Sequence, residues 1–292
     1  MNYSKKLHPL GFYQVYPLPS QEELELYYKE QYFQKERGSY THNYSDEEKS
    51  FFTNTAVIAE YIYRQFSNQL QGKLIDFGCG EGFFANYFLE NLWEISCCDF
   101  SSFGIEQHNP SLLPHFIQGD LYKTLDSKIA DGLVYDYINL ANVLEHVRQP
   151  IELLEGIKKL MHPKTLLRII VPNDFSLFQN LLVKKGLTQE TWFVPPDHLN
   201  YFTFDSLTNL LNARGLQTFK VISDFTVEAF LFNEHSNYWS DRSRGKQAHL
   251  SRVTIENFLI NQGIDNYINY REAAAKCDFG RSVIAFTYLA ST

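Results

Sequence analysis

A short apolar run that ends in a glycine-rich turn constrains the fold of this chain more than any other feature of its sequence. Residues 73–77 read Lys-Leu-Ile-Asp-Phe, and Gly-Cys-Gly-Glu-Gly follows at residues 78–82. Strands buried inside a parallel sheet have such continuous apolar runs, and glycine lets the backbone turn sharply and approach a ligand closely. In open parallel sheets, ligands bind beyond the carboxyl ends of the strands. The segment therefore predicts a first strand with a binding site at its end.

Short apolar strands alternate with helices along the rest of the chain. Helical periodicity is found between the strands and also upstream of them, at residues 52–66. Ser20 and Glu23 form a capping box, which predicts a further helix at residues 21–30. Helices between successive strands indicate a parallel sheet with helices on both faces. We therefore predict an α/β, doubly wound, Rossmann-like fold with a mostly parallel sheet of seven strands. Those strands are expected at residues 73–77, 93–98, 116–118, 132–140, 166–171, 216–222 and 282–289.

The same pattern divides the 292 residues into four parts. Residues 1–50 are polar and rich in tyrosine, and we expect a helical lid or extension there. Residues 51–232 are predicted to form the cofactor-binding core, and residues 277–292 its last strand. Residues 233–276, between these two pieces, are expected to be a helical insertion that could cover an acceptor.

The composition excludes several classes of protein. The chain has 34 acidic residues against 26 lysines and arginines, a net charge of −8, so a basic face for nucleic acid is not expected. No apolar run approaches the roughly 20 residues of a membrane span, and no signal peptide is recognised at the start. The 4 cysteines have neither metal-ligand nor disulfide spacing. We therefore expect a reducing, cytoplasmic location and no metal site, while the oligomeric state stays open.

Carboxylates stand at the ends of three successive predicted strands, as Asp76, Asp99 and Asp120. A nicotinamide dinucleotide site would need glycine where Phe83 stands, and Asp76 would repel its diphosphate, although an oxidoreductase remains a rival interpretation. A cationic ligand suits these acids better, and S-adenosylmethionine is a cation without phosphate. In this interpretation Asp76 meets the amine, Asp99 the ribose and Asp120 the adenine amino group.

Four further residues complete this predicted cofactor site. Phe100 would pack on the adenine, and Leu121 would contact it through its backbone. Asn142 follows the fourth strand and is expected at the methionine end, and Cys79 lies in the glycine turn. The alternative is that the turn is only a turn and that each acid only caps a helix.

Four segments carry a family resemblance: residues 74–82 (Leu-Ile-Asp-Phe-Gly-Cys-Gly-Glu-Gly), Cys98-Asp99, Gln118-Gly-Asp120 and residues 136–146 (Asp-Tyr-Ile-Asn-Leu-Ala-Asn-Val-Leu-Glu-His). In this order they resemble the successive motifs of class I S-adenosylmethionine-dependent methyltransferases. The resemblance covers about residues 56–221 and the final strand.

This resemblance implies S-adenosylmethionine as the cofactor, S-adenosylhomocysteine as the product, and a last strand antiparallel to the others. It implies that Asp76, Gly78 and Gly80 line the methionine part. It also implies that Asp99 lies at the ribose and Asp120 at the adenine.

The predicted catalytic base is His198. It lies in residues 195–203, Pro-Pro-Asp-His-Leu-Asn-Tyr-Phe-Thr, which resemble a loop of methyltransferases that act on sugars and other small hydroxylated molecules. An imidazole accepts a proton near neutral pH, and Asn200 and Tyr201 are predicted to contact the substrate. Alternatively, His198 only bonds a backbone group and shapes the pocket. The Glu145-His146 pair resembles one common in small-molecule methyltransferases; we favour a structural role for it, with His146 left open as a second candidate base.

The predicted acceptor is a small molecule, with the methyl group going to a hydroxyl of a sugar, a nucleotide-linked sugar or a glycan precursor, as in polysaccharide biosynthesis. The Asn-Pro-Pro-aromatic signature of amino-group methylation on DNA bases or protein amides is absent after the fourth strand, where Asn-Leu-Ala-Asn stands. Arg244 and Lys246, in a cation-rich part of the insertion, are predicted to bind a phosphate, although a solvated helix start would carry the same charges. The alternatives are a C- or N-methyltransferase of another metabolite, such as a quinone precursor or an amino sugar, and a non-catalytic binding protein of the same fold.

Overall fold

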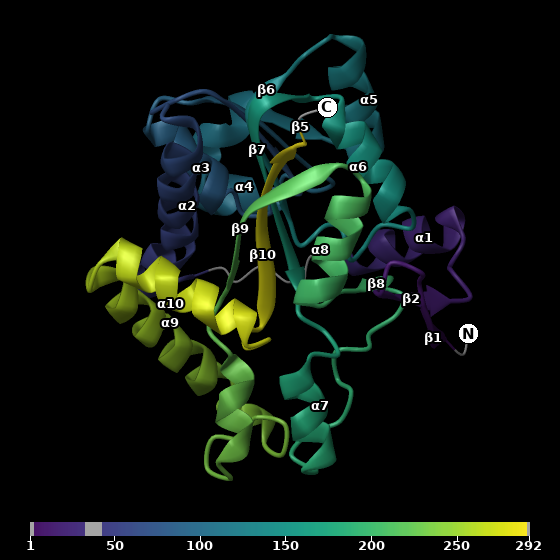
Figure 1. The fold of residues 1–292 in the computed structure, drawn as a ribbon, viewed down its shortest axis with the longest axis vertical. Coiled ribbons are helices and arrows are strands. Elements are labelled where there is room, and N and C mark those ends of the chain that lie inside the picture. Colours follow the sequence, from purple (N-terminus) through teal and green to yellow (C-terminus); the bar gives the residue numbers. More distant parts are fainter. Residues whose placement is uncertain (1–2, 33–42, 291–292) are drawn as a thin grey trace.

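A seven-stranded sheet forms the centre of the protein in the computed structural model, which describes residues 3–32 and 43–290 (Figure 1). The strand order is β5-β4-β3-β6-β7-β10-β9. Pairing is parallel from β5 to β7, whereas β10 runs antiparallel to both of its neighbours. The strands are β3 (Lys73–Phe77), β4 (Glu94–Asp99), β5 (Phe116–Gln118), β6 (Tyr135–Ala141), β7 (Met161–Pro172), β9 (Leu216–Ser223) and β10 (Ser282–Leu289). The predicted fold class and the antiparallel last strand are confirmed.

The register of β3 with its two neighbours places the ends of three strands at one level. Phe77, the last residue of β3, is opposite Cys98 on β4 and Leu140 on β6. The chain order reverses at β3, with β4 on one side and β6 on the other. This reversal is the topological switch point at which α/β sheets bind their ligands, so the loops after β3, β4 and β6 converge on the expected site.

Helices cover both faces of the sheet, as Figure 1 shows, with α2, α3 and α10 on one side and α5, α6 and α8 on the other. One buried apolar cluster joins the sheet to the first group through residues such as Ile62, Phe88 and Ile268. A second cluster joins it to the other group through residues such as Leu125, Leu154 and Leu207. The helices are α2 (Asp46–Ser67), α3 (Phe83–Glu90), α4 (Phe103–His108), α5 (Leu121–Ala130), α6 (Pro150–Lys158), α7 (Leu177–Lys184) and α8 (Phe204–Ala213), with a 3-10 helix, η1 (Pro110–His115), after α4.

The helix α2 begins six residues before the expected start at residue 52. Ser45 caps it, because its side chain accepts from the Glu48 N–H while Glu48 reaches back to the Ser45 N–H over 2.9 Å. This reciprocal capping satisfies two backbone donors at the helix start. The first turn is therefore stable although it carries no apolar face, which is why hydrophobic periodicity missed it.

A small second sheet, which the sequence did not predict, joins the amino-terminal segment to the His198 loop. It consists of β1 (Ser4–Leu7), β2 (Tyr13–Tyr16) and β8 (Asn200–Tyr201), in the order β1-β2-β8. Tyr13 pairs with Tyr201, and the Val15 N–H donates to the Leu199 carbonyl over 2.9 Å. The helix α1 (Gln21–Tyr32) follows, with the predicted capping box of Ser20 and Glu23 in place. The amino-terminal segment thus supports the loop that carries the candidate base.

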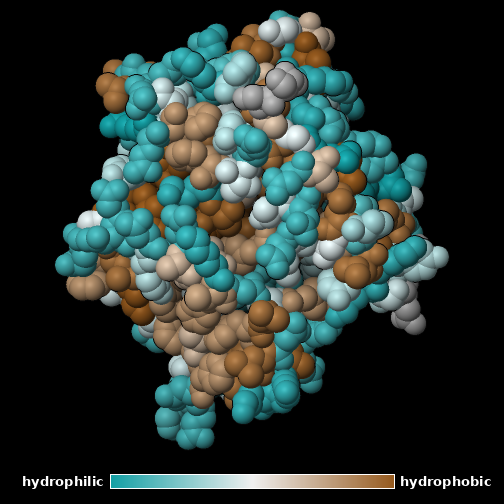
Figure 2. All heavy atoms as spheres, in the orientation of Figure 1, coloured by the Kyte–Doolittle hydropathy of each residue, from teal (hydrophilic) through white to brown (hydrophobic). Residues whose placement is uncertain are grey.

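A 3-10 turn, η2 (Val227–Phe232), precedes the insertion, which contains a second 3-10 turn, η3 (Arg242–Arg244), followed by α9 (Gly245–Asn261) and α10 (Ile264–Lys276). Asn54 of α2 donates to Asn257 of α9 over 2.9 Å, and the yellow α10 packs across the lower part of β9 in Figure 1. Figure 2 shows apolar residues gathered on the lower part of this face, where η2 and α7 lie. Among the described helices, none is long and apolar enough to cross a membrane.

Candidate functional site

The glycine turn after β3 leaves open space at the edge of the sheet. Gly78 and Gly80 have φ angles of +75° and +54°. Residues other than glycine rarely adopt such positive φ angles. The N–H groups of Gly78 and Cys79 donate to the Cys98 carbonyl over 2.9 and 3.2 Å. A Cβ on Gly80 would meet no atom within 4 Å, so a ligand can approach the backbone there.

Asp99, at the end of β4, is held against this turn. Its carboxylate accepts from the Gly80 N–H over 3.0 Å and from the Ser101 N–H over 3.2 Å. Burial raises the pKa of Asp99 above its ordinary value, and these backbone donors act in the opposite direction. The next side chain, Phe100, is 54% exposed. An acid fixed beside an exposed ring fits a ribose and an adenine.

Asp120, at the end of β5, caps the helix α5 by accepting from the Lys123 N–H over 3.0 Å. The capping role that was the alternative for this residue is therefore present. Gly119, just before it, has a φ of +153°, and a Cβ there would meet nothing within 4 Å. Leu121 is the first residue of α5 and is half-buried. The space beside Gly119 is the second opening along this edge.

Asp76 lies deeper than its predicted role suggested. It is 1% exposed, and its Oδ1 accepts from Asn139 of β6 over 2.6 Å. Arg168 of β7 in turn donates to Asn139 over 2.9 Å, so a polar ladder crosses three adjacent strands. Burial raises the pKa of Asp76 to about 6, while Asn139 and Arg168 act in the opposite direction. Contact between Asp76 and the cofactor amine stays a prediction.

His198 lies beside a buried carboxylate that sequence reasoning did not identify. Its Nδ1 is 3.8 Å from Oδ2 of Asp174, a residue that follows β7 and is 1% exposed. Arg281, just before β10, donates to the other oxygen of Asp174 over 2.8 Å. Burial acts to raise the pKa of Asp174, but His198 and Arg281 outweigh it and lower that pKa below its ordinary value. The Asp174 carboxylate is therefore ionised and faces the imidazole.

The rings of His146 and His198 meet edge to face, with centroids 4.9 Å apart. The Nδ1 of His146 is 2.7 Å from the Asp197 carbonyl, so a proton on Nδ1 would leave Nε2 as an acceptor. This Nε2 lies 3.8 Å from Oε1 of the buried Glu145. Burial raises the pKa of Glu145 to about 7, and its Oε2 has no hydrogen-bond partner within the described chain.

The ligand atoms of Glu145, His146 and His198 lie within 4.8 Å of one another, a separation that would suit a metal ion. Spacing along the sequence does not reveal this group, because His146 and His198 are brought together by folding. The expectation of no metal site therefore needs a direct test.

Comparison with known proteins decides the family. A family model described as a methyltransferase domain matches residues 52–221, more than half of the chain. The chain belongs to this methyltransferase family. S-adenosylmethionine is its methyl donor, so the predicted cofactor is confirmed. No curated protein matches the chain.

Solved structures share the methyltransferase fold at low sequence identity. The plantazolicin methyltransferase BpumL, in complex with a triazolic desmethylPZN analog and SAH, is 17% identical, with a TM-score of 0.53 over 92% of this chain and 98% of that chain. The plantazolicin methyltransferase BamL is 14% identical, with a TM-score of 0.50 over 94% of this chain and 92% of that chain. A SAM-dependent methyltransferase from Archaeoglobus fulgidus is 18% identical, with a TM-score of 0.48 over 90% and 98%.

The edge of the sheet that carries the glycine turn also contains Asn142 and Cys79, two further residues that are predicted to bind the cofactor. Asn142 has a φ of +53°, and its N–H donates to the Ile170 carbonyl over 2.9 Å. Val143 follows it and closes on the turn, since a Cβ on Gly78 would lie 2.6 Å from a Val143 methyl group. The Cys79 side chain is buried, which leaves only its backbone for contact with a ligand.

Asn200 and Tyr201 have other partners than a substrate. The Asn200 amide donates to the Leu144 and Val147 carbonyls over 3.1 and 2.7 Å and accepts from Gln14. The Tyr201 hydroxyl donates to the His198 carbonyl over 3.0 Å. Both side chains are buried and hold the His198 loop, and their contact with a substrate stays a prediction.

Most cations of the insertion are paired within the protein. Arg244 pairs with Asp241 over 3.0 Å and also donates to the Glu234 carbonyl. Arg252 pairs with Asp224 and Glu256. Lys246 is exposed on the first turn of α9. The predicted pairing of Arg244 and Lys246 around one phosphate therefore lacks support from the geometry.

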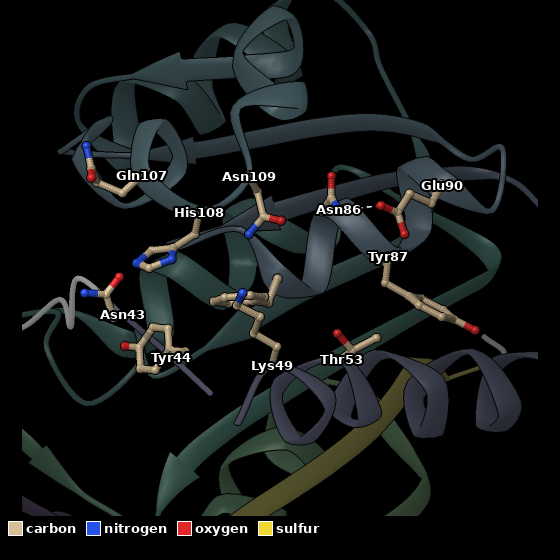
Figure 3. Close-up of a pocket in the computed structure, with 11 residues that line it drawn as sticks. Asn43, Tyr44, Lys49, Thr53, Asn86, Tyr87, Glu90, Gln107, His108 and Asn109 are labelled. Atoms are coloured by element: carbon tan, nitrogen blue, oxygen red, sulfur yellow. Dashed lines mark hydrogen bonds between the residues drawn. The ribbon is translucent and has the colours of Figure 1, made fainter. Parts of the chain in front are cut away.

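A polar hollow of about 440 Å³ lies between α2, α3 and α4, and none of the predicted cofactor residues lines it (Figure 3). Tyr44 and His108 lie on one side of it in the figure, and Asn86 donates to Glu90 at the other over 2.9 Å. Tyr44 also donates to Glu81 of the glycine turn over 2.7 Å. The hollow thus borders the back of the turn, away from the acids at the strand ends.

Proposed function

We propose that this methyltransferase transfers a methyl group to a hydroxyl of a small, sugar-like acceptor, with His198 as the base. The observation that carries the proposal is the ionised, buried Asp174 that faces the His198 imidazole and is held by Arg281. The group lies at the carboxyl edge of the sheet, after β7 and before β10. This edge is the one that carries the glycine turn.

The residues at the ends of β3, β4 and β5 would hold the cofactor. Gly80 and Gly119 would admit it close to the backbone, and Asp99 would accept from ribose hydroxyls. Bound S-adenosylmethionine supplies a methyl group on a sulfonium that leaves as a neutral thioether. We keep Asp76, Phe100 and Asp120 as proposed contacts of the amine and the adenine.

His198 would accept the proton that the acceptor hydroxyl loses as its oxygen bonds to the methyl carbon. The imidazole becomes a cation in this step, and the Asp174 carboxylate stabilises that charge. The separation of 3.8 Å exceeds a hydrogen bond, and catalytic contacts of this kind often shorten when the substrate binds. The site also positions the acceptor hydroxyl against the methyl carbon of the donor. Holding two bound reactants in this way removes a large part of the activation barrier.

The test is a transfer assay with S-adenosylmethionine labelled in its methyl group, run against sugars, nucleotide-linked sugars and glycan precursors. Mass spectrometry identifies a product heavier by one methyl group, and NMR locates the methylated oxygen. We expect His198→Ala to lower kcat about 10²- to 10⁴-fold, the usual contribution of a general base, with donor affinity unchanged. The matched control is His235→Ala, because His235 is exposed and, among the described residues, its side chain forms an ion pair only with Glu234. Methylation confined to carbon or nitrogen, or full activity of the His198 variant, would overturn the proposal.

A further inference from the structure

A second cavity, of about 590 Å³, lies between α7, the 188–192 loop, η2 and the insertion. The side chains that determine its chemistry are Trp192, Glu228, Tyr238, Trp239, Arg242 and Arg281. Three of these are large aromatic residues, and three carry a charge. The insertion supplies Tyr238, Trp239 and Arg242, so the cavity exists only because the insertion folds back against the core.

Two residues that line this cavity each have a buried polar atom with no partner in the described chain. The indole Nε1–H of Trp192 is a donor, and Oε2 of Glu228 is an acceptor. Both residues are 7% exposed. Buried donors and acceptors in folded proteins are nearly always paired, and these two unpaired groups belong to side chains in the wall of one cavity. Hydroxyl groups serve both, because each can donate and accept.

The aromatic residues narrow the class of ligand. Pockets for small molecules are lined mainly by aromatic and apolar side chains, with a few polar groups that set the orientation. Trp192, Tyr238 and Trp239 provide the apolar surface, while Trp192 and Glu228 provide the polar groups. A ring that has apolar C–H faces and hydroxyls around its edge matches both features.

Arg242 adds a positive charge to the cavity. It is exposed, and no carboxylate in the described part of the chain lies within ion-pair distance of it. Arg281, in contrast, already donates to Asp174 and forms an ion pair with Glu228 at 3.4 Å. Arg242 is therefore the residue placed to bind an anionic substituent of the ligand, in the role that the sequence had suggested for Arg244 and Lys246.

Arg281 connects the cavity to the candidate base. It lines the cavity and donates to Asp174, whose other oxygen faces His198 at 3.8 Å. We propose that this cavity binds the methyl acceptor and that the acceptor is a polyhydroxylated ring with an anionic substituent. Trp192, Glu228 and Arg242 bind this ring. The identity of this ligand as the methyl acceptor rests on the proposed function, whereas the binding of such a ring to the cavity does not.

Isothermal titration calorimetry without the methyl donor tests the cavity directly. The probes are a panel of hexose 1-phosphates, the matching methyl hexosides, and inorganic phosphate. We expect one or more hexose 1-phosphates to bind, and Glu228→Gln and Trp239→Phe to weaken that binding about tenfold or more, the effect of losing a buried polar or aromatic contact. Arg242→Ala should weaken hexose 1-phosphates but not methyl hexosides. Arg244→Ala is the matched control, since it removes the same charge from the same segment and should change nothing.

Thermal unfolding of each variant separates lost binding from lost folding, and Trp239→Phe keeps the result interpretable if Glu228→Gln is unstable. The proposal is overturned if no hexose derivative binds, or if inorganic phosphate binds as well as the hexose phosphates. It is also overturned if an acceptor is methylated normally by the cavity variants, although the proposed function would then stand. Cavity-dependent hexose binding without any methylated product would instead contradict the proposed function alone.

Discussion

The guanidinium of Arg281 donates to Asp174 over 2.8 Å, and this ion pair joins the aromatic cavity to His198. Asp174 lies just after the carboxyl end of β7, and Arg281 lies just before the amino end of the adjacent, antiparallel β10. The two residues are therefore at the same edge of the sheet. The antiparallel last strand is thus what brings Arg281 to the catalytic edge. If β10 ran parallel to β7, its first residues would lie at the opposite end of the sheet.

Asp174→Asn is expected to lower kcat about tenfold or more without changing donor affinity, because an amide does not stabilise the cation that forms on His198. Steady-state kinetics and donor titration measure the two effects. Asp241→Asn, which breaks a surface ion pair with Arg244, is the control and should keep full activity. Equal loss in both variants would mean that Asp174 acts only on folding.

Glu145→Gln is expected to stabilise the protein relative to the native sequence at pH 8 but not at pH 5. The pKa of Glu145 is about 7 in the folded protein, against an ordinary value of 4.5. Between these values the folded state holds a proton that the unfolded state releases, so stability falls as pH rises through this window. The stability difference between the two proteins should grow by about 2–3 kcal/mol from pH 5 to pH 8.

Urea unfolding at both pH values measures this change. Glu155→Gln, at a partly exposed ion pair with Lys158, should show only a small and nearly constant difference. A difference for Glu145→Gln that does not vary with pH would contradict the raised pKa.

Gly80→Ala is expected to lower the affinity for S-adenosylmethionine more than tenfold, because the new methyl group would occupy the open space at the turn. Gly215→Ala is the matched control. It also has a positive φ, and its Cβ also meets nothing within 4 Å, but it ends α8 away from the site. Calorimetry should show weaker donor binding for Gly80→Ala alone, although both variants lose some thermal stability. Equal donor affinity in the two variants would place the cofactor elsewhere.

Removal of divalent metal ions is expected to leave methyl transfer unchanged, because His198 acts as a base in the proposed mechanism. The assay compares activity before and after exhaustive treatment with EDTA. Loss of activity that Mn²⁺ or Zn²⁺ restores would show that Glu145, His146 and His198 hold a metal ion. That outcome would replace the base mechanism.

The features that the sequence predicts correctly are those for which one short segment carries the whole signal. The run 73–77 forms β3, and the glycines after it form the turn, as expected. The apolar character of a strand and the positive φ angles of a turn depend on the residues of the segment itself. The strand at 282–289 also matches β10 residue for residue. The caps of α1 and α5 are local for the same reason, since they join residues three positions apart.

Reasoning from the sequence failed where two distant segments meet. The hairpin β1-β2 was missed, because its four-residue strands are stabilised by β8, nearly two hundred positions further along the chain. The sequence also did not predict the partners of Asn200, whose amide donates to the Leu144 and Val147 carbonyls. The charges of the insertion resembled a phosphate site, but Arg252 pairs with Asp224, which lies outside the insertion, and with Glu256 of its own helix.

The positions of the strands along the chain, the glycine turn and the acids at the strand ends were predicted from the sequence alone, because hydrophobic period and backbone freedom act between near neighbours. The order of the strands within the sheet came only from the structure. Only the tertiary structure decided that Asp174 and Arg281 support His198, and that Arg242 rather than Arg244 lines the cavity. The reason is that ion pairing and burial depend on which distant side chains folding brings within a few ångströms, and the charges themselves do not specify their partners.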